Sequence, residues 1–113
     1  TELDVGGVGP EVLAELRRLE PYGQGNPEPV FRASQAEVVS CRIVGDQSQG
    51  KAGHLKLVLR SPDGGSPVDA IGFGMGDRDI TARQTVDVLY TPGINVWNGN
   101  ASLQLRLRDI KGY

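Results

Sequence analysis

Hydrophobic and polar residues alternate along most of the chain after residue 31, a pattern that is typical of β-strands with one buried face. The alternation is clearest over residues 54–60, where Leu55, Leu57 and Leu59 point to one side and His54, Lys56 and Arg60 to the other. The other predicted strands and loops are, in chain order, a strand over residues 36–44, a glycine-rich loop over 45–53, a turn cluster over 61–67, a strand over 68–73 and a strand from Thr85 onward.

The last two strands are predicted to form a long hairpin, because Asn98-Gly99 is a favoured pair for a two-residue turn. Centring the turn there pairs Trp97 with Asn100 and sorts the two strands onto two faces. One face is apolar: Val88, Tyr90, Ile94, Val96, Ala101, Leu103, Leu105 and Leu107. The other is mostly polar: Asn95, Trp97, Ser102, Gln104, Arg106 and Arg108. Leu89 is the apolar exception on the polar face, and Pro92-Gly93 predicts a bulge or bend at an edge-like position.

Two helical segments are predicted outside the strands. Pro10 is a favourable first helical residue, and apolar residues follow it at spacings of three and four as far as Leu19, so an amphipathic helix is expected over residues 10–19. A helix this short is marginal alone, and we expect it to dock either on the barrel or on a preceding domain. Residues 74–83 leave room for about two turns of helix between the third and fourth strands.

Five strands with a short helix between the third and fourth match the element order of the OB fold, a small β-barrel. The predicted fold class is mainly β: a five-stranded OB-fold barrel with an N-terminal helix. A small open β-sheet packed on that helix is the alternative. OB barrels bind oligonucleotides across their second and third strands, so nucleic acid is the first ligand class that the pattern indicates.

Residues 19–31, LEPYGQGNPEPVF, separate the first helix from the first strand. Their prolines exclude a helix or a central strand, so we expect residues 1–31 to form the helix and a connector, and residues 32–113 to form the barrel domain. This motif resembles the entry to the C-terminal OB domain of the RecJ family of single-strand-specific exonucleases. The resemblance extends to His54-Leu55-Lys56 and to residues 94–110, and Tyr22 stands where the family most often has Phe.

The resemblance implies a single-stranded-DNA-binding OB domain of a RecJ-like 5′-to-3′ exonuclease, acting in DNA repair and recombination. RecJ-like nucleases are described as using two metal ions, Mn or Mg, held by Asp- and His-rich motifs in a core upstream of this domain. None of those motifs occurs in this sequence. The chain is therefore expected to be non-catalytic and without a cofactor, with that upstream core as its partner. Its only methionine is Met75, which also predicts a fragment of a longer protein.

The charge is unevenly distributed along the chain. The formal total is −2, yet residues 1–31 carry six acidic and two basic side chains, whereas residues 32–113 carry eight acidic and ten basic ones. One face of the barrel is therefore predicted to be basic despite the negative total. The single cysteine, Cys41, excludes an internal disulfide and favours a cytoplasmic setting, and no apolar run is long enough to span a membrane.

Single-strand binding requires cations for the phosphates and flat side chains on which bases stack. The predicted DNA-binding residues are Arg42, Lys51, His54, Lys56, Arg60, Trp97, Gln104, Arg106 and Arg108. Each has a plainer interpretation: a strand Arg or Lys is often only solvated, His54 can cap a strand end, and Trp97 can cover the end of the barrel. Tyr22 is a further aromatic candidate, but it equally suits packing of the connector.

Two weaker motifs are given no functional role. The glycines at 72, 74 and 76 follow a strand but lack the lysine and long helix of a phosphate-binding loop. Asp77 and Asp79 are interpreted as solvated residues rather than a metal pair. Two other functions remain as alternatives. One is a protein-interaction module that docks an acidic tail of a single-strand-binding protein, and the other is a stand-alone hydrolase, which the missing catalytic constellation disfavours.

Overall fold

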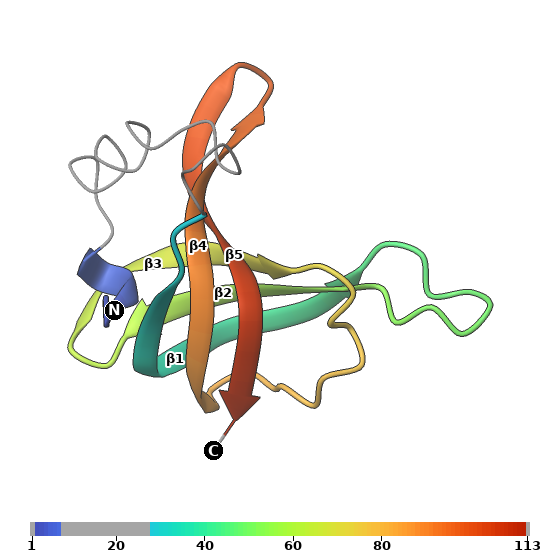
Figure 1. The fold of residues 1–113 in the computed structure, drawn as a ribbon, viewed down its shortest axis with the longest axis horizontal. Helices are drawn as coiled ribbons and strands as arrows, with labels where there is room; N and C mark the ends of the chain where they lie inside the picture. The colour runs from blue at the N-terminus through green and yellow to red at the C-terminus, as the bar shows by residue number, and fades with distance from the viewer. Residues whose placement is uncertain (1, 8–27, 113) are drawn as a thin grey trace.

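The computed structural model describes residues 2–7 and 28–112 of the chain. These residues form a short 3-10 turn and five β-strands that wrap into a barrel (Figure 1). In chain order the elements are η1 (Val5–Gly7), β1 (Phe31–Val44), β2 (His54–Ser61), β3 (Gly64–Gly72), β4 (Thr85–Trp97) and β5 (Asn100–Gly112). No helix within the described residues is long and apolar enough to cross a membrane.

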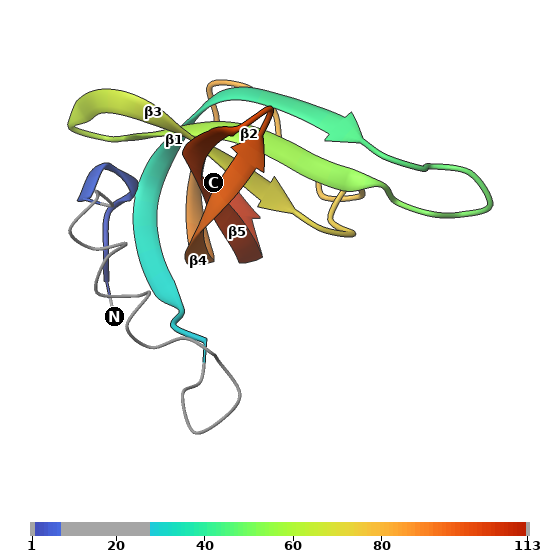
Figure 2. The same cartoon turned by 90° about the horizontal axis from the view of Figure 1, so that it is seen from above.

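β1 closes the barrel because it pairs with two different strands. Its first half lies antiparallel to β4, beginning with Phe31 opposite Tyr90, and its second half lies antiparallel to β2. A register shift in each ladder accompanies the passage from one partner to the other, and Gln35, with a φ of 58°, lies within the first shift. Figure 2 shows the resulting curve of β1 around the barrel. The closed strand order β1-β2-β3-β5-β4 confirms the predicted barrel over the open sheet.

The core is formed by the inward positions of the strands. In β2 the buried residues are the leucines predicted to face inward, Leu55, Leu57 and Leu59. Tyr90 is the largest fully buried side chain that the structure describes, and its hydroxyl donates a hydrogen bond to the carbonyl oxygen of Leu3 at 2.7 Å. Burial of the ring, together with the negative charges of Asp4 and Glu2, raises the pKa of the Tyr90 hydroxyl. This hydrogen bond, together with those from Leu3 N–H to the Arg32 carbonyl and from the Ser61 hydroxyl to Asp4, attaches residues 2–7 to the barrel.

The β4–β5 hairpin has the predicted turn, and the predicted register holds from the turn as far as Tyr90 opposite Leu107. Asn98 and Gly99 have φ values of 50° and 78°, as a two-residue hairpin turn requires, and Trp97 pairs with Asn100. The expected irregularity at Pro92-Gly93 lies elsewhere, between Leu89 and Tyr90. Pro92 fits into the regular β4–β5 ladder, where it lies opposite Leu105. On the other side of β4, the pairing with β1 ends at Tyr90, so no β1 carbonyl needs a hydrogen bond from position 92, where proline has no N–H.

The predicted helix between the third and fourth strands is wrong. Residues 73–84 form a series of turns. Gly74 has a φ of 71°, which ends any regular helix, and the backbone of Gly76 lies so close to the carbonyl of Ala52 that a side chain could not be accommodated. Further along, the Cys41 thiol donates a hydrogen bond to the carbonyl of Ile80 at 3.2 Å. Close packing against the β1–β2 loop and β1 therefore replaces helical hydrogen bonding in this segment.

Two strands begin earlier in the chain than predicted. β1 starts at Phe31 instead of residue 36, and β3 starts at Gly64 instead of residue 68. The turn-forming composition of residues 61–67 is concentrated in a tight turn at Pro62 and Asp63, and the glycines that follow extend β3. The helix predicted over residues 10–19 and the connector as far as residue 27 lie outside the described residues. The division into residues 1–31 and 32–113 stays a prediction.

Candidate nucleic-acid interface

Three of the predicted cations lie on one outer face of the barrel. Arg42 of β1 is opposite Lys56 of β2, Lys56 is opposite Ile71 of β3, and Ile71 pairs with Arg106 of β5. Directly paired residues project from the same side of a sheet, so these four side chains form one row across four strands, called the outer row below. The outer row combines three positive charges with one apolar side chain, which suits a ligand with phosphates and bases.

Gln104 lies beside the outer row. It alternates with the buried Leu105 and so projects from the same side of β5 as Arg106, as predicted. Its partner on β3 is Asp69, whose exposed carboxylate places a negative charge on this side of the barrel. The phosphate groups of a nucleic acid are therefore favoured along the outer row and disfavoured next to Asp69.

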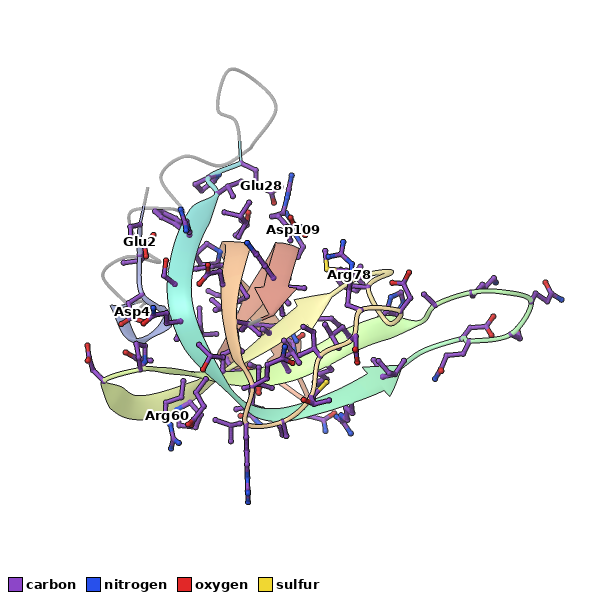
Figure 3. All side chains as sticks on the ribbon, turned by 90° about the horizontal axis from the view of Figure 1, so that it is seen from below. Glu2, Asp4, Glu28, Arg60, Arg78 and Asp109 are labelled. Atoms are coloured by element: carbon purple, nitrogen blue, oxygen red, sulfur yellow. The ribbon has the colours of Figure 1, made fainter. Side chains whose placement is uncertain are left out.

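Arg106 and Arg108 share one carboxylate, that of Glu28. Arg108 Nη1 donates to Glu28 Oε2 at 2.8 Å, and Arg106 Nη2 forms an ion pair with Glu28 Oε1. The Glu28 side chain is 27% exposed, less than the 43% and 44% of the two arginines. Glu28 lies just before β1, at the end of the proline-rich connector, and is labelled in Figure 3. Sequence reasoning did not identify this residue as part of the site.

Arg42 and Lys56 have no such partner. Within the described part of the chain, no carboxylate lies within ion-pair distance of either side chain. Guanidinium and ammonium groups that face water without a counter-charge are available to phosphate oxygens. These two side chains are therefore the strongest phosphate-binding candidates of the outer row.

Arg60 and Lys51 lie farther from the outer row, and each has an acidic partner. Arg60 pairs with Glu37 of β1, well apart from Glu28 in Figure 3. Lys51 lies in the β1–β2 loop, where its ammonium is 3.1 Å from a carboxylate oxygen of Asp46. Hydrogen bonds from the hydroxyl and backbone N–H of Ser48, and from Lys51, lower the pKa of Asp46. The carboxylate is thus ionised at neutral pH and orders this loop.

His54 contacts an aromatic residue that the sequence analysis did not select, Phe73. The two rings meet edge to face, with centroids 5.3 Å apart and an interplanar angle of 74°. His54 Nδ1 accepts a hydrogen bond from the N–H of Gly74 at 2.9 Å, so in the neutral ring Nε2 carries the proton. Phe73 is 58% exposed although it is a large apolar residue. In the sequence, Phe73 follows the outward-facing Asp69 and Ile71 at intervals of two residues, and this spacing was the available signal that its ring faces outward.

Two hollows flank this aromatic pair. The first, called the hairpin pocket below, has a volume of about 440 Å³ and lies between β3 and the β4–β5 hairpin. It is lined by Glu28, Ile71, Phe73, Thr91, Pro92, Gly93, Ile94, Gln104 and Arg106. The second, also about 440 Å³, is lined by His54 and the β1–β2 loop, including Lys51. The first includes Ile71 and Arg106 of the outer row, and the second lies on the His54 side of the pair and also includes the carboxylate-bearing Asp46.

A larger hollow lined by described residues is a poor site for nucleic acid. It has a volume of about 890 Å³ and lies between η1 and the β2–β3 hairpin. The charged residues in its lining are Asp4 and Asp69, both acidic, and Asp4 Oδ1 is buried without a hydrogen-bond partner. Phosphates are repelled by such a lining, so the size of this hollow does not make it the binding site.

Two aromatic candidates cannot be placed. Trp97 is the last residue of β4 and pairs with Asn100, but its side chain lies outside the part that the structure describes. Tyr22 lies outside the described residues altogether. The stacking roles considered for these two residues stay predictions.

A metal-binding function has no support in the described residues. They contain no group of three or more His, Cys, Asp or Glu side chains that could hold an ion. Asp77 and Asp79 belong to the series of turns between β3 and β4. The donor set needed for two-metal phosphodiester hydrolysis is therefore not assembled by this part of the chain.

Comparisons with known proteins identify the family of the chain. The sequence matches the family described as the RecJ OB domain over residues 1–109. It is 30% identical over 105 residues to the single-stranded-DNA-specific exonuclease RecJ of Thermus thermophilus, covering 93% of this chain and 14% of that protein. The chain thus spans a small part of its relative's length.

Solved structures show the same relationship. The crystal structure of RecJ from Thermus thermophilus in complex with Mn²⁺ aligns with a TM-score of 0.64 and 30% identity, covering 97% of this chain and 15% of that one. The SSB domain of a Synechococcus protein aligns with a TM-score of 0.54 at 14% identity, covering 72% of this chain and 91% of that domain. At 14% identity, the similarity to the SSB domain supports the fold alone.

Proposed function

Because the chain belongs to the RecJ OB-domain family, we propose that it is the single-stranded-DNA-binding domain of a RecJ-like 5′-to-3′ exonuclease. The outer row carries this proposal, since it brings Arg42, Lys56 and Arg106 from three strands onto one face around an apolar residue. The domain holds the strand through its phosphates and bases, and the cleavage chemistry belongs to a catalytic core elsewhere in the longer protein.

Single strands suit this face better than a duplex does. Unpaired bases are free to turn their faces toward apolar side chains while their phosphates stay on the cations, whereas the base faces of a duplex are stacked on one another. Ile71 lies between Lys56 and Arg106 in the ladders, so apolar and cationic contacts are within reach of the same few nucleotides. We expect single strands to bind more tightly than duplex of equal length.

The proposal assigns no catalytic step to the chain. The Mn²⁺ of the Thermus RecJ structure belongs to that protein, and the described residues here supply no comparable ligand set. We expect no degradation of a labelled single strand by the isolated chain with Mn²⁺ or Mg²⁺. Degradation that needs the metal and stops in Asp77→Asn/Asp79→Asn would contradict this assignment.

The outer row can be tested by its electrostatic signature. Each neutralised phosphate of a single strand contributes about −0.7 to the slope of log K against log salt, so three or four contacts give roughly −2 to −3. The double variant Arg42→Ala/Lys56→Ala should bind DNA more weakly, and its slope of log K against log salt should be shallower by about 1.4. Arg83→Ala is the matched control, because Arg83 is an exposed cation on the β3–β4 loop. Equal affinities and slopes in all three proteins would exclude the outer row.

One observation favours a second function, the docking of an acidic protein tail. Arg106 and Arg108 already hold a carboxylate from a peptide segment of the same chain, that of Glu28. A carboxylate of a single-strand-binding protein could be held in the same way. Titration of an acidic tail peptide into the DNA complex separates the functions: a shared site predicts mutual exclusion, and a peptide that binds while DNA never does would favour the alternative.

A further inference from the structure

The hairpin pocket has the composition of a site for a flat, partly polar ligand. Ile71, Pro92 and Ile94 supply apolar surface, while Arg106 and Gln104 supply hydrogen-bond donors. The pocket volume of about 440 Å³ lies within the range of small-molecule binding sites. A nucleobase attached to its sugar and phosphate combines the same three requirements: an apolar face, a polar edge and an anion nearby.

Phe73 gives this pocket a stacking surface that is already positioned. Its ring is held by the edge-to-face contact with His54, whose own orientation is fixed by the N–H of Gly74. The side chain nevertheless remains 58% exposed at the border of the pocket. A large apolar ring that is oriented by its neighbours and left open to water is suited to stack against a ligand.

Arg106 is positioned for a phosphate of a nucleotide at this place, where the Glu28 carboxylate, which also lines the pocket, pairs with Arg106 in the free chain. Phe73 lies two residues after Ile71, just past the end of β3, and Ile71 pairs with Arg106. Phe73 and Arg106 both line the pocket. A base on Phe73 therefore has a guanidinium within reach of its own or the adjoining phosphate. A base inside a duplex is stacked on both faces and cannot enter the pocket without being unstacked.

We infer that the hairpin pocket binds one unstacked nucleobase, which stacks on Phe73 while a neighbouring phosphate contacts Arg106. This inference rests on the proposed function and adds a base-binding site to its phosphate contacts. Gly93 lines the pocket without a side chain and so leaves space in it. An added Cβ at this position would lie 3.5 Å from the carbonyl oxygen of Gln104, which is an ordinary contact. A larger side chain at this position would fill the pocket without straining the backbone.

The test compares an oligothymidylate with an abasic sugar-phosphate strand of equal length, bound to the unaltered chain and to variants. Phe73→Ala should weaken oligothymidylate binding by roughly 5- to 150-fold and leave the salt slope unchanged. Phe73→Trp should keep the affinity, and Gly93→Leu should lower it. The abasic strand should bind Phe73→Ala and the unaltered protein equally. Leu89→Ala, at an apolar residue 40% exposed on β4, is the matched control.

The outcomes separate this inference from the proposed function. Oligothymidylate binding that is the same in Phe73→Ala, Gly93→Leu and Leu89→Ala overturns the pocket and leaves single-strand binding intact. An equal loss for the oligothymidylate and the abasic strand in Phe73→Ala also overturns it, since stacking requires a base. No binding by the unaltered chain overturns both proposals. Unchanged melting of Phe73→Ala, expected for an exposed side chain, shows that the variant is folded.

Discussion

The carboxylate of Glu28 lies 2.8 Å from the guanidinium of Arg108 and at the same time pairs with Arg106. Carboxylate and phosphate oxygens are interchangeable acceptors for guanidinium groups, so under the proposed function Glu28 competes with a DNA phosphate for the two arginines of β5. The strand must either displace this carboxylate or bind beside it. Under the proposed function, Glu28 therefore limits how much the two arginines contribute to DNA affinity.

Glu28→Gln should bind single strands more tightly than the unaltered chain. The substitution removes a competing anion and frees Arg106 and Arg108 for up to two more phosphate contacts, which steepens the salt slope by up to about 1.4. Stability should change by less than about 1 kcal/mol, because all three side chains are partly exposed. Binding titrations over a salt series measure the effect, and unchanged affinity and slope would show that the arginines do not contact DNA.

The hairpin illustrates how far sequence patterning reaches. Asn98-Gly99 set the turn, and the predicted pairing holds from Trp97 opposite Asn100 to Tyr90 opposite Leu107. Beyond that point the register shifts, because Arg108 and Asp109 are both exposed between the buried Leu107 and Ile110. Two successive polar residues between buried ones break the alternation of a strand, and this was the available signal for the bulge.

Two features of the site could not be predicted in this way. The ion pairs of Glu28 join the connector to β5 and depend on closure of the barrel, which no local periodicity encodes. The segment over residues 73–84 was long enough for a helix, but its glycines permit turns that pack against the β1–β2 loop. Tertiary contacts thus decided both cases over local propensity.

Trp97→Ala tests the hairpin as a DNA contact. If Trp97 stacks a base, the substitution should weaken single-strand binding by about 1–3 kcal/mol and leave the fold intact. If the indole instead covers the end of the barrel, unfolding free energy should fall by about 3–5 kcal/mol. Melting and oligonucleotide titration distinguish these results, with Arg83→Ala as the surface control and Arg106→Ala as a second test of the same face. If Trp97→Ala has a much lower melting temperature while Arg106→Ala binds DNA with unchanged affinity, this part of β4 and β5 does not belong to the site.

Tyr90→Phe tests the attachment of residues 2–7 to the barrel. The change removes the hydrogen bond from the hydroxyl to the Leu3 carbonyl and keeps the ring, so it should lower the unfolding free energy by about 0.5–1.5 kcal/mol. Chemical denaturation measures the loss. DNA affinity should not change, because Tyr90 lies in the core rather than on the outer row. A stability equal to that of the unaltered chain would indicate that this hydrogen bond contributes nothing net.

Asp109 should make a small, acid-sensitive contribution to stability. Hydrogen bonds from the Arg78 guanidinium at 3.0 Å and from the N–H of Ile110 at 2.9 Å hold the pKa of Asp109 below its ordinary value. A carboxyl with a lowered pKa in the folded state stabilises that state above its ordinary pKa, and the contribution is lost as the pH falls through the folded-state pKa.

Asp109→Asn should therefore be less stable than the unaltered chain at about pH 7, and the difference should vanish toward about pH 2. Denaturant midpoints across this range measure it. Asp79→Asn is the control, since the Asp79 carboxylate has no hydrogen bond or ion pair within the described residues. A difference between Asp109→Asn and the unaltered chain that stays constant with pH would contradict the assigned cause.

Mapping the bound strand on the folded chain tests the central claim most directly. Backbone amide chemical shifts would be followed while a short oligothymidylate is added. The account predicts that the perturbed amides cluster around the outer row and the hairpin pocket, at Lys56, Ile71, Phe73 and Arg106. Perturbations confined to the 890 Å³ hollow beside η1, near Asp4, Ser61 and Gly65, would contradict it.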